Sequence, residues 1–144
     1  CLKENLCLKQ KGSSQLKLID FGSSCFQSKT GQFDIEFNQK KIVFFVLLVY
    51  TYIQSRYYRA PEILLGIEYR KSIDMWSLGC ILGELYTGHP LFPGRNEQEQ
   101  ICFIVQLIDL PPKSMLDKAK RKTVFFGKSI VVLCVENHFN RIDF

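Results

Sequence analysis

The chain has 144 residues, of which 47% are apolar and 23% charged, and its 19 basic and 14 acidic side chains give a formal net charge of +5. This is the profile of one ordinary soluble domain, and the chain is too short for a large enzyme. The longest uninterrupted apolar run, Ile42–Tyr50, has nine residues. A membrane-spanning helix needs about 18–20 such residues, so we expect no membrane segment.

The six cysteines are scattered, with no CxxC pair and no histidine at the spacing of a zinc site. They predict reduced thiols in an intracellular protein of the cytoplasm, the nucleus or both. The one basic cluster, Lys118, Lys120, Arg121 and Lys122, is more typical of a solvated helix face than of a nucleic-acid patch. We therefore expect no nucleic-acid partner, while a basic nucleic-acid binder remains an alternative that this cluster would support.

In chain order, the first predicted element is a small antiparallel hairpin. Two short apolar stretches, Leu6–Lys9 and Leu16–Ile19, flank a polar loop that contains Gly12. Farther along, the β-branched and aromatic run Ile42–Val49 would by itself indicate a buried strand.

The second half of the chain predicts helices. Ile63–Leu65 begins a short one after a proline turn, and Ser72–Thr87 predicts a long one, deeply buried because apolar residues surround most of it. Asn96 followed by Glu99 resembles a capping box, and apolar residues then repeat at helical spacing up to a pair of prolines. Met115–Lys122 predicts one more short, basic helix.

Four motifs occur in the order in which protein kinases carry them. Cys1–Asn5 resembles the catalytic-loop pattern D-L-K-P-E-N, and Asp20-Phe21-Gly22 follows a predicted strand. Ala60-Pro61-Glu62 precedes a predicted helix, and Ser72–Gly79 resembles the long helix that anchors the kinase C-lobe. Each motif alone is weak evidence, but all four in the correct order make coincidence very unlikely.

The resemblance can be narrowed to the dual-specificity tyrosine-regulated kinases. Tyr50–Glu62 contains the Tyr-x-Tyr-Ile-Gln-Ser-Arg string of this group, Pro90–Gly94 is similar to it, and Leu110–Arg121 resembles its second class. The resemblance covers roughly residues 1–28 and 49–126. It implies an α+β, mostly α fold: a partial protein-kinase C-lobe of a small β-hairpin plus helices, with the N-lobe absent.

This resemblance implies ATP and Mg²⁺ as cofactors. Asp20 and Asn5 would supply hard oxygen ligands to the Mg²⁺ that bridges the nucleotide phosphates, and Lys3 would place a positive charge beside the transferring phosphoryl group. Lys3 and Asp20 are thus the predicted catalytic residues, and Asn5 and Asp20 the predicted cofactor and metal ligands. The structural alternatives are a turn carboxylate for Asp20 and a loop side chain bonded to backbone for Asn5.

The resemblance also implies a regulatory site. Tyr52 is the position that the family would autophosphorylate, and Arg56 and Arg59 follow it by four and seven residues. Phosphotyrosine attracts guanidinium groups, so we hypothesise that these arginines would bind phospho-Tyr52 and shape the pocket for a proline-directed Ser/Thr substrate. The alternative is that Tyr52 is only a packing aromatic.

Three departures from the pattern predict that this chain alone is inactive. It lacks the glycine-rich loop, the β3 lysine, the αC glutamate and the His-Arg pair that orient ATP, so we expect a fragment whose true start is missing. Cys1 stands where the catalytic aspartate belongs, and a thiol cannot replace an ionised carboxylate as the base. The interval from Asp20 to Glu62 exceeds the usual spacing by roughly 18 residues.

Residues 1–126 are therefore predicted to be a partial kinase domain, with 29–48 an insertion or unspliced segment and 127–144 an unrelated tail. The predicted function is that of a fragment of an ATP-dependent dual-specificity protein kinase, acting on Ser/Thr of protein substrates and on its own Tyr52. Two alternatives stay open: a non-catalytic kinase-like interaction module, which Cys1 favours, and the product of a faulty gene model.

Overall fold

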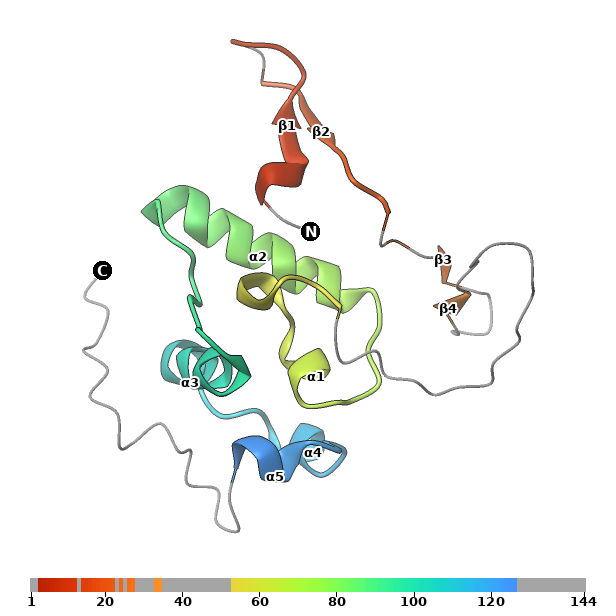
Figure 1. The fold of residues 1–144 in the computed structure, drawn as a ribbon, viewed down its shortest axis with the longest axis vertical. Coiled ribbons are helices and arrows are strands. Elements are labelled where there is room, and N and C mark those ends of the chain that lie inside the picture. The colour runs from red at the N-terminus through yellow and green to blue at the C-terminus, as the bar shows by residue number, and fades with distance from the viewer. Residues whose placement is uncertain are drawn as a thin grey trace. The chain divides into compact units, whose positions relative to one another are not determined.

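The structure is a computed structural model that describes residues 3–12, 14–22, 24, 26–27, 33–34 and 53–126 (Figure 1). The chain divides into two compact units. The first unit comprises residues 3–48, and the second comprises residues 1–2 and 49–144.

The first unit contains the predicted hairpin. Strands β1 (Leu6–Leu8) and β2 (Leu16–Leu18) pair antiparallel, with Leu6 opposite Leu18. The backbone N–H of Lys9 donates to the carbonyl of Gln15 at 2.9 Å and continues the pairing toward the turn. Gly12 takes a φ of +81° within this turn, where a side chain would be strained.

Three further elements of this unit, a 3-10 helix and two short strands, were not predicted as such. The 3-10 helix η1 (Lys3–Asn5) leads directly into β1. Two-residue strands, β3 (Phe26–Gln27) and β4 (Phe33–Asp34), form a second antiparallel hairpin.

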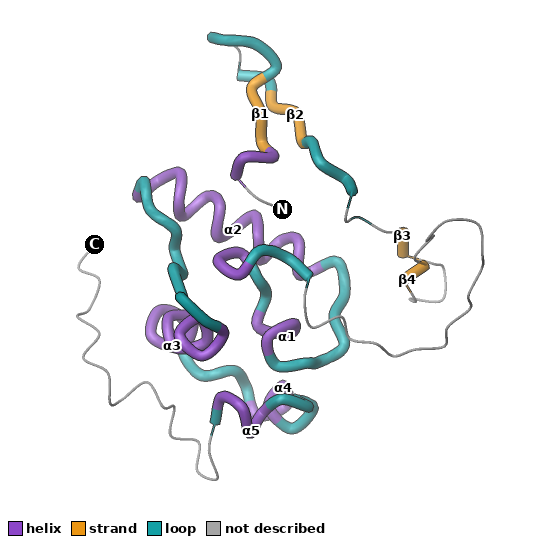
Figure 2. Tube along the Cα trace, viewed as in Figure 1, coloured by secondary structure: helices purple, strands orange, loops and turns teal. Residues whose placement is uncertain are grey.

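The second unit is helical in its described part (Figure 2). Its elements are η2 (Arg56–Tyr58), α1 (Pro61–Leu64), α2 (Ser72–Thr87), α3 (Glu97–Ile108), α4 (Lys113–Leu116) and α5 (Lys122–Phe125). The 3-10 helix η2 packs against α2, and α3 contacts α1, α5 and η2. The predicted bounds of α2 and the helical nature of 97–108 are confirmed.

Local chemistry sets the ends of these helices. Pro61 begins α1, where its fixed φ suits a helix and its missing N–H costs nothing. The left-handed Gly88, with φ +82°, ends α2 and donates its N–H to the carbonyl of Glu84 at 2.8 Å. Asn96 caps α3 by accepting the N–H of Glu99 at 2.8 Å. The Glu99 carboxylate accepts the N–H of Arg95, one residue before the position that a capping box would use.

One part of the core of the second unit lies between α1 and the start of α2. Ala60, Ile63 and Ile73 form a buried cluster, and Ile53, Tyr69 and Trp76 pack against it. The indole of Trp76 also stacks on Phe92 with ring centroids 5.7 Å apart, so this tryptophan is a packing residue.

The prediction that α2 is deeply buried is wrong. Only one face of the helix is covered, with Ile73, Ser77, Cys80, Ile81 and Glu84 buried. On the rest of the helix large apolar side chains are exposed, namely Met75, Leu78, Leu82, Leu85 and Tyr86. Apolar composition indicates which residues favour burial, but a helix buries only the face against which another element packs.

The prediction of one helix over Met115–Lys122 is also wrong. Residues 117–121 form turns between the two four-residue helices α4 and α5. The backbone N–H of Arg121 donates to the carbonyl of Leu65 at 3.1 Å, a tertiary hydrogen bond that takes the place of the helical one. Local helix propensity is a weak preference that such contacts override.

Several predictions concern residues outside the described ones: Cys1, Tyr52, nearly all of residues 29–48, and the segment 127–144. Among the described helices none is long and apolar enough to cross a membrane. Cys7 and Cys80 are free thiols, whereas Cys102 is disulfide-bonded, so the prediction of reduced thiols is wrong for Cys102. Spacing along the chain could not reveal this, because a disulfide depends on which thiols meet in space.

The Asn96 cap yields a first prediction. Replacing Asn96 by Ala leaves the N–H of Glu99 without its side-chain acceptor, so the free energy of unfolding should fall by about 1 kcal/mol. The measurement is urea unfolding of the protein. Asn96→Ser, which retains a capping oxygen, is the control and should unfold close to wild type; equal losses in both variants would contradict the capping role.

Candidate functional site

Two of the predicted site residues meet in the first unit. Asn5 ends η1, and its carbonyl accepts the N–H of Ile19 at 2.9 Å, which places it beside the residues that follow β2. The Asn5 side-chain nitrogen Nδ2 lies 3.5 Å from Oδ2 of Asp20, at the outer limit of a hydrogen bond. The structure therefore brings the carboxamide and the carboxylate together.

The backbone of Asp20 is unusual. Its φ of +63° lies in the left-handed region, which non-glycine residues adopt rarely and aspartate tolerates better than most. Such conformations cost about 1–3 kcal/mol and concentrate at functional sites. Asp20 is exposed and Asn5 is partly exposed, so both side chains face solvent that a ligand could replace.

The donor set at this site fits Mg²⁺ held together with phosphate. Magnesium is usually bound by one or two carboxylates plus substrate phosphates and water, with no need for an all-protein cage. One carboxylate and one carboxamide oxygen meet that requirement. Within the described residues there is no group of three or more His, Cys, Asp or Glu side chains that could hold a metal ion by itself. Lys3 begins η1 in the same unit, and its side chain lies outside the described part.

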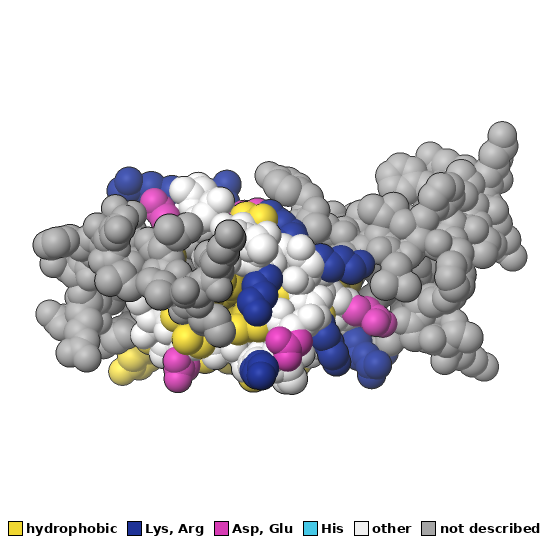
Figure 3. Space-filling model, turned by 90° about the horizontal axis from the view of Figure 1, so that it is seen from below, with side chains coloured by type: hydrophobic (Ala, Val, Ile, Leu, Met, Phe, Trp, Pro, Cys, Tyr) yellow, Lys and Arg dark blue, Asp and Glu magenta, His cyan; other side chains and the backbone are white. Residues whose placement is uncertain are grey.

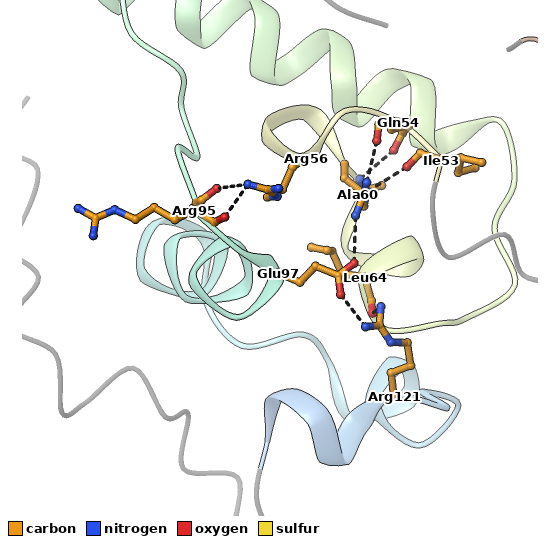
Figure 4. Close-up of polar contacts among 10 residues, drawn as sticks. Ile53, Gln54, Arg56, Ala60, Leu64, Arg95, Glu97 and Arg121 are labelled. Atoms are coloured by element: carbon orange, nitrogen blue, oxygen red, sulfur yellow. Dashed lines mark hydrogen bonds and ion pairs between the residues drawn. The ribbon is translucent and has the colours of Figure 1, made fainter.

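In the second unit the predicted phosphate-binding arginines already have partners (Figure 4). The Arg59 side chain is 4% exposed, and its guanidinium donates to the carbonyls of Ile53 and Gln54, each at 3.0 Å. Arg56, which is partly exposed, donates to the carbonyl of Arg95 at 2.6 Å. Arg59 thus braces the backbone that directly follows Tyr52, and Arg56 ties η2 to the start of α3.

Gln54 is held from several sides. Its φ is +62°, a strained value for a residue with a side chain. Its amide Nε2 donates to the carbonyl of Ile73 at 2.9 Å and to the hydroxyl of Ser77 at 2.8 Å, and its Oε1 accepts the N–H of Ala60 at 3.0 Å. The Gln54 carbonyl also accepts a hydrogen bond from Arg59. The side chain of Gln54 thus holds this turn against α2.

Glu97, at the first turn of α3, joins two arginines. Its Oε1 accepts from Arg59 at 3.0 Å and its Oε2 accepts from Arg121 at 2.6 Å. The hydrogen bond from Arg121, aided by the charges of both guanidinium groups and opposed by partial burial, lowers the pKa of the Glu97 carboxyl below its ordinary value. The N-terminal end of the helix also favours a negative charge.

Sequence analysis missed Gln54, Glu97 and Arg121. Arg121 belongs to the cluster interpreted as a solvated face, yet it is partly buried and ion-paired, whereas Lys118 and Lys120 are exposed as predicted. On the face viewed in Figure 3, basic side chains are interspersed with acidic ones. The capping pattern that marks the start of α3 was the only sequence signal near Glu97.

Comparisons with known proteins identify the family of the chain. The protein kinase domain model matches residues 2–141 of the chain. The chain therefore belongs to the protein kinase domain family, and the hairpin and helices are part of such a domain.

Its relatives include dual-specificity tyrosine-phosphorylation-regulated kinases. The chain is 48% identical over 134 residues to kinase 2 of this group from Drosophila melanogaster, with 93% of the chain and 16% of the relative covered. It is 50% identical over 123 residues to human kinase 4, with 85% and 20% covered. It is 49% identical over 126 residues to the DYRK-family kinase pom1 of Schizosaccharomyces pombe, with 88% and 10% covered. The chain thus spans a fifth or less of each of these relatives.

The Glu97 ion pairs predict a pH-dependent stability. Because the folded-state pKa of Glu97 is lowered, its ion pairs stabilise the protein above the ordinary pKa of 4.5, and this stabilisation is lost as the pH falls through the lower folded value. Glu97→Gln should lower the free energy of unfolding by about 2 kcal/mol at pH 7. Breaking a fully buried ion pair costs more, ~3–5 kcal/mol, because the remaining charge is then left unpaired.

The measurement is denaturant unfolding of wild type and variant from pH 7 to pH 3. The difference between their free energies of unfolding should shrink as the pH falls. Glu99→Gln serves as the control, because Glu99 lies on the same helix and accepts a backbone N–H that an amide oxygen can also accept. A difference for Glu97→Gln that stays constant across this pH range would contradict the role of the charge.

Proposed function

We propose that the full-length protein containing this chain is an ATP-dependent dual-specificity protein kinase that phosphorylates Ser/Thr of protein substrates and its own Tyr52. Two relatives at about half identity are named dual specificity tyrosine-phosphorylation-regulated kinases. The single observation that carries the proposal for this chain is the approach of the Asn5 carboxamide to the Asp20 carboxylate, 3.5 Å apart.

In this mechanism the chain's residues position charge and do no covalent chemistry. Mg²⁺-ATP, when bound, supplies the phosphoryl group and neutralises part of its charge. Asp20 and Asn5 would hold the metal through side-chain oxygens, and the Asp20 carboxylate lies beside the Asn5 carboxamide. Lys3, two residues before Asn5, would supply a positive charge to the transferring phosphoryl group.

The regulatory part of the proposal concerns Tyr52. Phosphorylation adds about −1.5 to −2 charges, which pair best with guanidinium groups. Arg56 is the more accessible partner, because it is partly exposed and its described contacts are to backbone carbonyls. Arg59 can contribute mainly through its positive charge or by exchanging an existing contact, since it is buried on Glu97 and two carbonyls.

A non-catalytic kinase-like module is the second candidate, and the observation that favours it is Cys1 at the position of the catalytic aspartate. A thiol does not orient and deprotonate a substrate hydroxyl as a carboxylate does. The two candidates differ in whether phosphate is transferred, so they are separated by measuring transfer directly.

The experiment measures transfer of phosphate from Mg²⁺-ATP to a Ser/Thr peptide and to Tyr52 in the full-length protein. Asp20→Asn and Asn5→Ala should each lower kcat by at least about 10²-fold. The reason is that a bound metal ion stabilises the charge of the transition state by several kcal/mol, and each variant removes one of its ligands. Asp117→Asn, which removes an exposed carboxylate from the loop after α4, is the charge-matched control and should retain activity. Activity that survives Asp20→Asn would overturn the assignment of the site.

The role of Cys1 yields a separate prediction. If the thiol limits the reaction, Cys1→Asp should raise kcat by the ~10²–10⁴-fold that a positioned general base contributes. Cys1→Ser, which changes the same atom without supplying a carboxylate, should not. A full-length protein that binds Mg²⁺-ATP but transfers no phosphate, even as Cys1→Asp, would support the non-catalytic module.

A further inference from the structure

Arg121 contacts three other parts of the second unit. Its guanidinium donates to the Glu97 carboxylate at 2.6 Å and to the carbonyl of Leu64 at 3.0 Å. Its backbone N–H donates to the carbonyl of Leu65 at 3.1 Å, and its guanidinium carbon lies 5.3 Å from the ring centre of Phe125. The end of α1, the start of α3 and α5 therefore meet on this one side chain (Figure 4).

The fold leaves specific room for the stem of Arg121. A Cβ added at Gly66 would lie 3.1 Å from Cγ and 3.3 Å from Cδ of Arg121. Gly66 also takes a φ of +68° at the end of α1. The same glycine thus allows the turn after α1 and the close passage of the arginine.

Glu97 connects Arg121 to Arg59, because its carboxylate binds both guanidinium groups. The carboxylate binds one guanidinium on each oxygen, so the position of Arg121 fixes the oxygen that remains for Arg59. A carboxylate with only one anchor would be free to rotate, whereas two opposed donors define its plane.

Arg59 connects Glu97 to the backbone that follows Tyr52. Its Nε and one terminal nitrogen bind the carbonyls of Ile53 and Gln54, while its other terminal nitrogen binds Glu97. Because the guanidinium is rigid and planar, holding one edge on Glu97 orients the edge that holds the turn. Gln54 needs such support, because its φ of +62° is strained.

The geometry points to Arg121 as a positioning residue for the segment 53–60: through Glu97 and then Arg59, it sets the turn that follows Tyr52 and leads into the Ala60-Pro61-Glu62 motif. This inference rests on the proposed kinase function and on the hypothesis that Arg56 and Arg59, which lie in this segment, shape the protein-substrate pocket. Arg121 itself contacts neither ATP nor the reacting atoms in this assignment. Its loss should therefore weaken protein-substrate binding while leaving the chemistry of bound ATP largely intact.

The test uses the full-length protein with Arg121→Gln, Arg121→Lys and the control Lys120→Gln, which removes an adjacent exposed cation. Amide hydrogen exchange across 53–60 reports the order of the turn directly, whether or not the protein is active. Kinetics with a Ser/Thr peptide then separate KM for the peptide from KM for ATP and from kcat.

For Arg121→Gln we expect exchange across 53–60 to speed up and the peptide KM to rise about tenfold, the size of one lost hydrogen bond to a charged group. Exchange in α2, kcat and the ATP KM should change less than about twofold, which a general loss of stability would not give. Arg121→Lys should recover part of the effect, because an ammonium keeps the charge on Glu97 but not the planar fork. Lys120→Gln should match wild type.

Each other outcome overturns a distinct statement. Unchanged exchange across 53–60 in Arg121→Gln overturns the connection through Glu97. Faster exchange with unchanged peptide KM shows that Arg121 is structural only. A wild-type protein that transfers no phosphate overturns the proposed function, and with it the substrate-positioning role, whatever the exchange result.

Discussion

The second unit depends on satisfying one buried positive charge. Arg59 is almost wholly removed from water, and leaving a guanidinium there without partners would cost several kcal/mol. Its partners come from two places: the backbone of Ile53 and Gln54, and the carboxylate of Glu97 on α3. Because Glu97 also binds Arg121, the cost of burying Arg59 is offset only when α1, α3 and the segment after α4 are assembled around it.

In the first unit, the register of the β1–β2 hairpin determines which residues meet. Pairing Leu6 with Leu18 places the residue before β1 beside the residues after β2. Asn5 and Asp20, fifteen positions apart, therefore lie at the same end of the hairpin with their polar heads 3.5 Å apart. The hairpin is thus the structural reason why a carboxamide and a carboxylate can share a ligand.

Sequence reasoning succeeded where the determinants are local and erred where distant contacts decide. The stop at Gly88 and the cap at Asn96 are local, and α2 and α3 end and begin there. The burial of α2 was overestimated, because apolar composition cannot show which face receives a packing partner. Arg121 was interpreted as one of several solvated cations, although its tertiary contacts distinguish it from Lys120.

By itself, the sequence determined the family, the order of the motifs, the hairpin and the long helix, because short patterns of turn, cap and apolar residues act over a few positions. Only the tertiary structure decided that Gln54 adopts a strained turn and that Glu97 joins Arg59 to Arg121. The physical reason is that a buried ion pair is favourable only when folding brings its members within hydrogen-bonding distance. The members here are 38 and 24 residues apart in the chain, and no local pattern records their meeting.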